Sequence, residues 1–159
     1  MNKALLRTAI LEQLRRDLAQ QVGAAHLARD EAISEESRAE NKYDTHSQEA
    51  AYLAEGQARL AADIEESLAA YTALPLPEFG KGDAIALGAV VELIHGARHH
   101  WYFLGPRAGG MELRVDGREL LLLTPQSPLG RQLIGKKAGE RVNVPGRGTT
   151  AAHQIATVL

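Results

Sequence analysis

Two stretches in the first half of the chain repeat apolar residues with a heptad spacing. The two seams consist of Leu11, Leu14, Leu18, Gln21, Ala25, Ala28 and Ala32, and of Leu53, Gln57, Leu60, Ile64, Ser67, Tyr71 and Leu74. When the second seam is read backwards, each pair of positions adds up to 85, so one antiparallel register accommodates both. The pattern predicts an antiparallel α-helical coiled-coil hairpin over residues 1–75, with its tip near residues 41–46.

The second half of the chain alternates short apolar runs with turn residues. The runs at 84–94, 101–104, 111–115, 118–124, 141–144 and 151–158 read as strands, and Asp116-Gly117 is a type I′ hairpin turn. Ser127 and Pro128 are an N-cap and a first-turn proline for a short helix that runs to about Ile134. Residues 76–159 are therefore predicted to form an antiparallel β-sheet domain with one short helix, so the chain belongs to the α+β class.

Composition supports a division near residue 75. All six prolines and thirteen of the fifteen glycines lie in the second part, and the net charge is −5 before residue 75 and +3 from there on. The absence of cysteine excludes disulfide frameworks and thiolate metal sites. No apolar run is long enough to cross a bilayer, and no signal peptide is recognisable. We expect a cytoplasmic protein without a membrane partner.

The hairpin is most acidic around its predicted tip. Residues 30–55 hold eight acidic residues against two basic ones, and the seam leading there is built from alanine, which keeps the rod narrow. Like charges at one end cost stability unless that end meets a cation or a basic channel. The pattern favours a probe with an acidic tip, while a dimerisation or spacer coiled coil remains the alternative.

A motif in the second half resembles a known family. Residues 127–136 read Ser-Pro-Leu-Gly-Arg-Gln-Leu-Ile-Gly-Lys, followed by Gly-Glu-Arg-Val-Asn-Val at 139–144 and a Pro-Gly-Arg-Gly turn at 145–148. Residues 85–91, Ile-Ala-Leu-Gly-Ala-Val-Val, match the family's first strand. Together with the preceding hairpin, these segments resemble the bacterial Gre transcript-cleavage factors over the whole chain, and this resemblance implies an FKBP-like second domain.

The resemblance also implies a function. Gre factors dock their second domain on RNA polymerase at the secondary channel and extend the hairpin towards the active site. Two acidic tip residues then help to hold a Mg²⁺ ion, which is shared with the polymerase and transient, so that the polymerase cleaves the 3′ end of its own backtracked RNA. The factor is an accessory protein rather than an enzyme. Residues that the resemblance places against the polymerase are Ser127, Pro128, Arg131, Lys136 and Lys137.

The tip departs from the family pattern. Asp44 stands where the first acid belongs, Ser47 occupies the place of the second, and Glu49 is the nearest substitute. The resemblance thus assigns Asp44 and Glu49 as the catalytic, Mg²⁺-binding pair. The alternative is that these residues have structural roles. Asp44 caps the second helix, or Thr45 does so in a capping box, and Glu49 lies in the first turn, where the helix dipole favours a negative charge.

Three functions follow from these features of the chain. The first is stimulation of transcript cleavage by a monomeric elongation factor. The second is a Gre-fold regulator that occupies the channel without cleavage. The third is a coiled-coil adaptor unrelated to polymerase.

Two further groups of residues are assigned to structure rather than to chemistry. His95, His99 and His100 surround a strand connection, where a solvated turn is the expected outcome and a metal site the alternative. The adjacent aromatics 101–103 are expected to divide between the two faces of the sheet.

Overall fold

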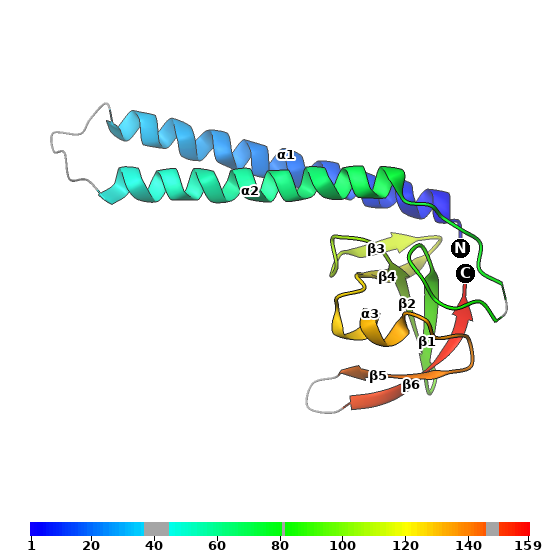
Figure 1. Cartoon of the computed structure of the whole chain (residues 1–159). Helices are drawn as coiled ribbons and strands as arrows, with labels where there is room; N and C mark the ends of the chain where they lie inside the picture. The colour runs from blue at the N-terminus through cyan, green and yellow to red at the C-terminus, as the bar shows by residue number, and fades with distance from the viewer. Residues whose placement is uncertain (37–44, 81, 146–149) are drawn as a thin grey trace. The chain divides into compact units, whose positions relative to one another are not determined.

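A computed structural model of the chain shows two long helices followed by a β-sheet and a short helix (Figure 1). The structure describes residues 1–36, 45–80, 82–145 and 150–159. The predicted α+β class is confirmed. The helices are α1 (Lys3–Glu36), α2 (Thr45–Ala73) and α3 (Pro128–Leu133), and the strands are β1 (Val90–His95), β2 (Arg98–Leu104), β3 (Glu112–Val115), β4 (Arg118–Leu123), β5 (Arg141–Pro145) and β6 (Thr150–Val158).

The chain divides into two compact units. One unit contains Glu12–Ala69, which is most of the helical hairpin. The other contains Met1–Leu11 together with Ala70–Leu159, so it combines the outer ends of both helices with the whole sheet. Residues 41–44 of the predicted tip, including Asp44, lie outside the described residues, whereas residues 45 and 46 are the first two of α2.

Within the hairpin unit, α1 and α2 run antiparallel beside each other (Figure 1). The seam predicted for α1 faces inward, because its members from Leu14 to Ala28 are buried or half-buried. The seam predicted for α2 is partly wrong. Gln57, Ile64 and Ser67 are shielded from solvent, but Leu53 and Leu60 are 55% and 49% exposed.

Alanines explain this difference. Ala54 and Ala61 each follow one of the exposed leucines in the sequence. Both alanines are half-buried, whereas the heptad predicted that the leucines would be shielded. The facing part of α1 is also built from small residues, with Ala25 and Ala28 shielded. Alanine packed against alanine lets the helix axes approach more closely than leucine would allow. The α2 interface is therefore rotated relative to the leucine heptad, and the leucines lie on its flank.

The outer ends of the helices are fixed to the linker within the sheet unit. The Lys3 ammonium donates to the carbonyl of Pro77 and lies 4.7 Å from the centre of the Phe79 ring. Arg7 donates to the carbonyl of Leu74 over 2.5 Å, at the end of α2. Burial lowers the pKa of Lys3. The Arg7 contact thus satisfies a carbonyl just beyond the end of α2, and the Lys3 contact satisfies one in the linker.

Tyr71 continues the same attachment. Its side chain is 1% exposed, and its hydroxyl donates to the carbonyl of Arg107 over 2.6 Å. Burial raises its pKa. The ring occupies the space beside Gly105, where a Cβ atom would lie 2.0 Å from the Tyr71 hydroxyl oxygen. The end of α2 thus packs on the loop after β2 through a contact that requires glycine.

The sheet has six strands in the order β3-β4-β2-β1-β6-β5. All neighbouring pairs are antiparallel except β2 and β4, which are parallel, with Trp101 opposite Leu120 and Leu104 opposite Leu123. The sheet is therefore mixed rather than antiparallel throughout. After β2 the chain passes to the edge, forms β3, and returns by a tight hairpin so that β4 lies between β3 and β2.

The hairpin turn between β3 and β4 has the conformation that the sequence predicts. Asp116 and Gly117 both have positive φ, 52° and 73°, as a type I′ turn requires. The predicted strand at 84–94 is shorter, because β1 begins only at Val90. Gly88 explains the late start, since it has a φ of 84° and a Cβ there would lie 2.9 Å from the carbonyl oxygen of Pro75.

One face of the sheet and α3 enclose the main core. It contains Leu93 and Leu104 from the central strands, Leu133 from α3 and Ile155 from β6, each fully buried. Tyr102 lies in the same cluster, whereas Phe103 is outside it although it is 1% exposed. The predicted division of the neighbouring aromatics between the two faces is therefore confirmed.

Candidate functional site

The motif that begins at Ser127 forms the start of α3. Ser127 has extended backbone angles and is the N-cap, and its Oγ accepts a hydrogen bond from the Gly130 amide over 3.0 Å. The same hydroxyl donates to the carbonyl of Thr124 over 2.8 Å. Pro128 occupies the first turn, where its missing N–H costs nothing. Ser127 and Pro128 are thus structural residues, and only Pro128 is exposed.

Two residues fix α3 against the rest of the domain. Gly130 is buried, and a Cβ there would lie 1.9 Å from the carbonyl oxygen of Thr124. Gln132 imitates a neighbouring strand, because its amide nitrogen donates to the carbonyl of Asn143 and its amide oxygen accepts from the Asn143 N–H, both over 2.9 Å. The helix is therefore held to edge strand β5 by a pair of hydrogen bonds.

This anchoring leaves one strip of α3 on the surface. Pro128, Arg131 and Ile134 are exposed at intervals of three residues, while Leu129 and Leu133 are buried. Ile134, at the C-cap, is 41% exposed. From the sequence Ile134 was identified only as the approximate end of the helix, so its exposure was not predicted. The exposed strip of α3 therefore combines a cation with one partly exposed apolar side chain.

The basic residues of the motif surround this strip. Arg131 and Lys137 are exposed, and Lys136 is half-buried. The Lys136 ammonium lies 3.1 Å from a carboxylate oxygen of Glu140, whose other oxygen accepts from the Lys137 N–H over 2.6 Å. The Lys137 amide, with Lys136, lowers the pKa of Glu140. Glu140 thus partly neutralises Lys136 and leaves Arg131 and Lys137 as the main positive charges.

The second predicted site is the tip of the hairpin. Asp44 lies outside the described residues, whereas Glu49 is exposed on α2. The first turn of α2 carries no acidic residue, so the alternative that Glu49 serves the first-turn dipole is wrong. Glu49 belongs to the hairpin unit and α3 to the sheet unit. Because Asp44 lies outside the described residues, its pairing with Glu49 stays a prediction.

Among the described residues, no group of three or more histidines, cysteines or carboxylates could hold a metal ion. Glu49 is one of several exposed carboxylates of the hairpin, which include Asp30, Glu31 and Glu55. A carboxylate of the described residues could therefore add one ligand to a metal ion that another molecule holds. It does not form a metal site by itself.

His95, His99 and His100 are exposed around the turn between β1 and β2, as predicted, and two of them also contact a histidine on β6. The rings of His95 and His153 stack with their centres 4.8 Å apart, and the ring of His100 lies 5.9 Å from that of His153. His153, on β6, is 7% exposed. His99 points away from this group and lies 2.8 Å from a carboxylate oxygen of Glu92. The pairing of β1, β2 and β6 brings His95, His100 and His153 together, and we call these residues the histidine trio. His153 was not among the histidines singled out from the sequence.

The trio predicts that acid destabilises the fold. Burial, and then the positive charges of His153, Arg98, His95 and His99, lower the pKa of His100. In the unfolded chain His100 protonates near pH 6.5, so stability falls as the pH drops from about 7 to about 5. Thermal melts across this range should show a smaller loss for His100→Gln than for the wild-type protein. An equal loss in both would mean that His100 does not contribute.

The comparisons with known proteins give a fold likeness only. No family model and no curated protein matches the chain. Solved structures that resemble it, each at 18% identity, are the transcription factor Gfh1 (TM-score 0.43, covering 94% of this chain and 93% of that one), GreA factor homolog 1 of Thermus thermophilus (0.39, 95% of each), and Gfh1 of Thermus aquaticus (0.42, 95% and 94%). At these values the likeness assigns neither an activity nor a binding partner.

No described helix is long and apolar enough to cross a membrane.

Proposed function

We propose that this protein is a Gre-type transcription factor that docks on RNA polymerase through α3 and inserts its helical hairpin into the secondary channel. The observation that carries the proposal is the surface of α3. Ser127, Gly130 and Gln132 hold the helix so that Pro128, Arg131 and Ile134 face solvent together. This supports a role in binding for the motif, in addition to its role in folding.

Within this proposal, the tip carboxylates contribute to the chemistry. A hard cation such as Mg²⁺ takes oxygen ligands, and a second Mg²⁺ at a polymerase active site would polarise the scissile phosphate or a water molecule. Asp44 and Glu49 would add negative charge beside such an ion, and the polymerase would supply its other ligands. The protein is then an accessory factor, and the hydrolysis belongs to the polymerase.

A second candidate function rests on Ser47. The motif resemblance calls for an acid at this position, and serine cannot supply a negative charge. A factor with one carboxylate could fill the channel and block it without promoting cleavage. Cleavage of a backtracked RNA in the presence of the full chain separates the two functions, because only the first shortens the transcript.

Binding to polymerase is the direct test of the proposal. The full-length protein should bind core RNA polymerase in a fluorescence anisotropy titration, and unlabelled protein should displace it. The absence of binding at micromolar concentration and low salt would overturn both candidate functions and favour a coiled-coil adaptor.

Charge reversal on α3 gives a sharper result. Arg131→Glu is expected to weaken binding to polymerase about tenfold at low salt, because it replaces an exposed cation beside Ile134 with an anion. The difference from wild type should shrink as the salt concentration rises and screening increases. Arg98→Glu, an equal charge reversal on β2, is the matched control and should bind normally. Equal losses for both variants would indicate a nonspecific effect of net charge.

A further inference from the structure

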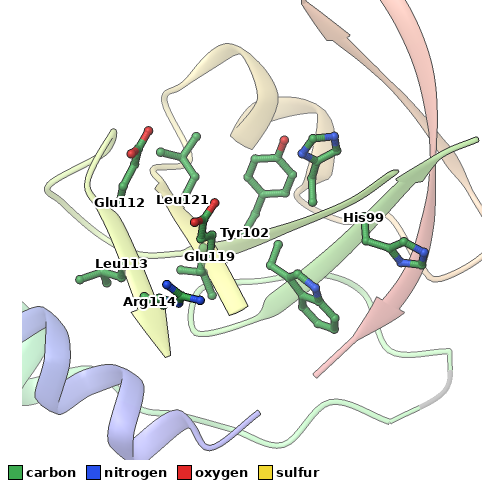
Figure 2. A pocket seen from close by; sticks show the side chains of 10 residues that line it. His99, Tyr102, Glu112, Leu113, Arg114, Glu119 and Leu121 are labelled. Carbon is green, nitrogen blue, oxygen red and sulfur yellow. The ribbon is translucent and has the colours of Figure 1, made fainter. Parts of the chain in front are cut away.

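A pocket of about 460 Å³ opens on the sheet, at a place that the proposed function does not use. Strands β2, β3 and β4 form it (Figure 2). Its residues include Tyr102 and Leu121 on the floor and three charged residues, Glu112, Arg114 and Glu119. The volume is sufficient for one or two amino-acid side chains with their backbone.

The strand register arranges the polar groups in two rows. In the first row Glu112 lies opposite Leu121, and Leu121 lies beside Tyr102. In Figure 2 these three side chains rise from the sheet on the same side. In the second row Arg114 lies opposite Glu119. Because strands are about 4.8 Å apart, each row spans about 10 Å across the sheet.

Tyr102 supplies a hydrogen-bonding group that the fold does not use. Its side chain is 8% exposed, yet no partner for its hydroxyl occurs among the described residues. Burial raises its pKa, so the phenol stays protonated and can donate. The hydroxyl oxygen is not one of the fully buried polar atoms of the described residues, so water or a ligand can reach it and accept its hydrogen bond.

The charged side chains that line the pocket give it a net negative charge. Within the described part of the chain, no ion pair engages Glu112, Arg114 or Glu119, all of which are exposed. His100, at one side of the pocket, has a lowered pKa and is mainly neutral at pH 7. Two carboxylates against one guanidinium favour a cationic ligand.

We propose that this pocket binds a basic, extended peptide segment of a partner protein. A lysine or arginine side chain of the peptide lies between Glu112 and Glu119, and a peptide carbonyl accepts a hydrogen bond from Tyr102. Leu121 provides the apolar contact beneath the chain. An extended peptide repeats its side chains every 6–7 Å or so, which suits polar groups distributed over two rows. Nucleic acid is disfavoured because its phosphates would face the two carboxylates.

This proposal does not depend on binding to RNA polymerase, so the full-length protein can be tested alone. Isothermal titration calorimetry measures binding without a reporter group, which suits this site because the Trp101 ring lies on the opposite face of the sheet from Tyr102 and Leu121. An acetylated and amidated Ala-Lys-Ala-Lys-Ala peptide should bind with saturation below about 1 mM, a weak but measurable affinity. The matched Ala-Glu-Ala-Glu-Ala peptide should not bind.

Two variants test the assigned contacts. Glu112→Gln combined with Glu119→Gln should weaken binding of the lysine peptide about tenfold or more, because charge-assisted hydrogen bonds are lost. Tyr102→Phe keeps the ring and should weaken binding about fivefold through loss of one hydrogen bond. Glu12→Gln, which removes an exposed carboxylate from α1, is the control and should bind as wild type does.

Three outcomes would overturn the proposal. The first is equal binding of the lysine and glutamate peptides. The second is unchanged affinity in the Glu112/Glu119 double variant, which alters only exposed side chains and should fold normally. The third is displacement of the peptide by a single-stranded oligothymidine, which would indicate a nucleic-acid site instead.

Discussion

Gly130→Ala is expected to destabilise the protein by about 2–4 kcal/mol, the range of a severe core substitution. The new methyl group would lie 1.9 Å from the Thr124 carbonyl oxygen and 2.8 Å from Ser127 Oγ. Thr124 and α3 would have to move apart, and the Ser127 hydroxyl would lose its bonds to the Thr124 carbonyl and the Gly130 amide. Urea denaturation of the variant, compared with wild type, measures the loss.

Two glycine substitutions provide controls for this effect. Gly23→Ala lies within α1 with no atom within 4 Å of the new Cβ, so it should stabilise the helix by up to about 1 kcal/mol. Gly135→Ala also meets no atom, but its φ of 79° makes alanine unfavourable by about 1 kcal/mol. If Gly130→Ala cost no more than Gly135→Ala, the close approach to Thr124 would not determine the position of α3.

Features set by neighbouring residues were predictable from the sequence. The Asp116-Gly117 turn, the Ser127 cap and the first-turn proline each depend on backbone preferences within a few residues, and each occurs as expected. Strand β6 was also predicted, because its apolar and β-branched residues need only a partner strand. These local signals agree with the global fold, which is why the α+β class could be inferred.

Features that depend on distant residues were not predictable in the same way. The leucine heptad on α2 gave a partly wrong interface, because the choice between Leu53 and Ala54 depends on how close α1 comes. The parallel pairing of β2 with β4 depends on where the chain crosses the sheet, and a strand pattern does not encode this. The position of the β1 start depends on the approach of the linker at Pro75 to Gly88.

The same distinction applies to functional residues. The α3 motif was recognised because its residues are contiguous, although the exposure of Ile134 required the structure. The histidine trio and the Tyr102 pocket each combine three strands, so no spacing in the sequence indicates them. Pairs such as Arg114 and Glu119 become neighbours only through the register of β3 and β4.

Asp44→Asn is expected to reduce cleavage of backtracked RNA by orders of magnitude if the tip acts on a polymerase-bound Mg²⁺. Asparagine keeps the size and much of the capping ability of aspartate but removes the negative charge that the cation favours. Folding should change by no more than about 1 kcal/mol, the scale of a helix cap. The measurement is cleavage by a stalled polymerase complex with saturating factor, together with an anisotropy titration showing that binding is retained.

Glu49→Gln decides whether Glu49 is the second acid. If it is, the variant should lose cleavage as Asp44→Asn does, and added Mg²⁺ should restore part of the activity of both, because a weakened site fills at higher metal concentration. Asp30→Asn, at an exposed position of α1, is the matched control and should cleave normally. Full activity of Asp44→Asn would leave Asp44 as a helix cap. If the wild-type protein binds polymerase but never promotes cleavage, the serine at position 47 is the physical reason, because one carboxylate at the tip cannot replace a pair.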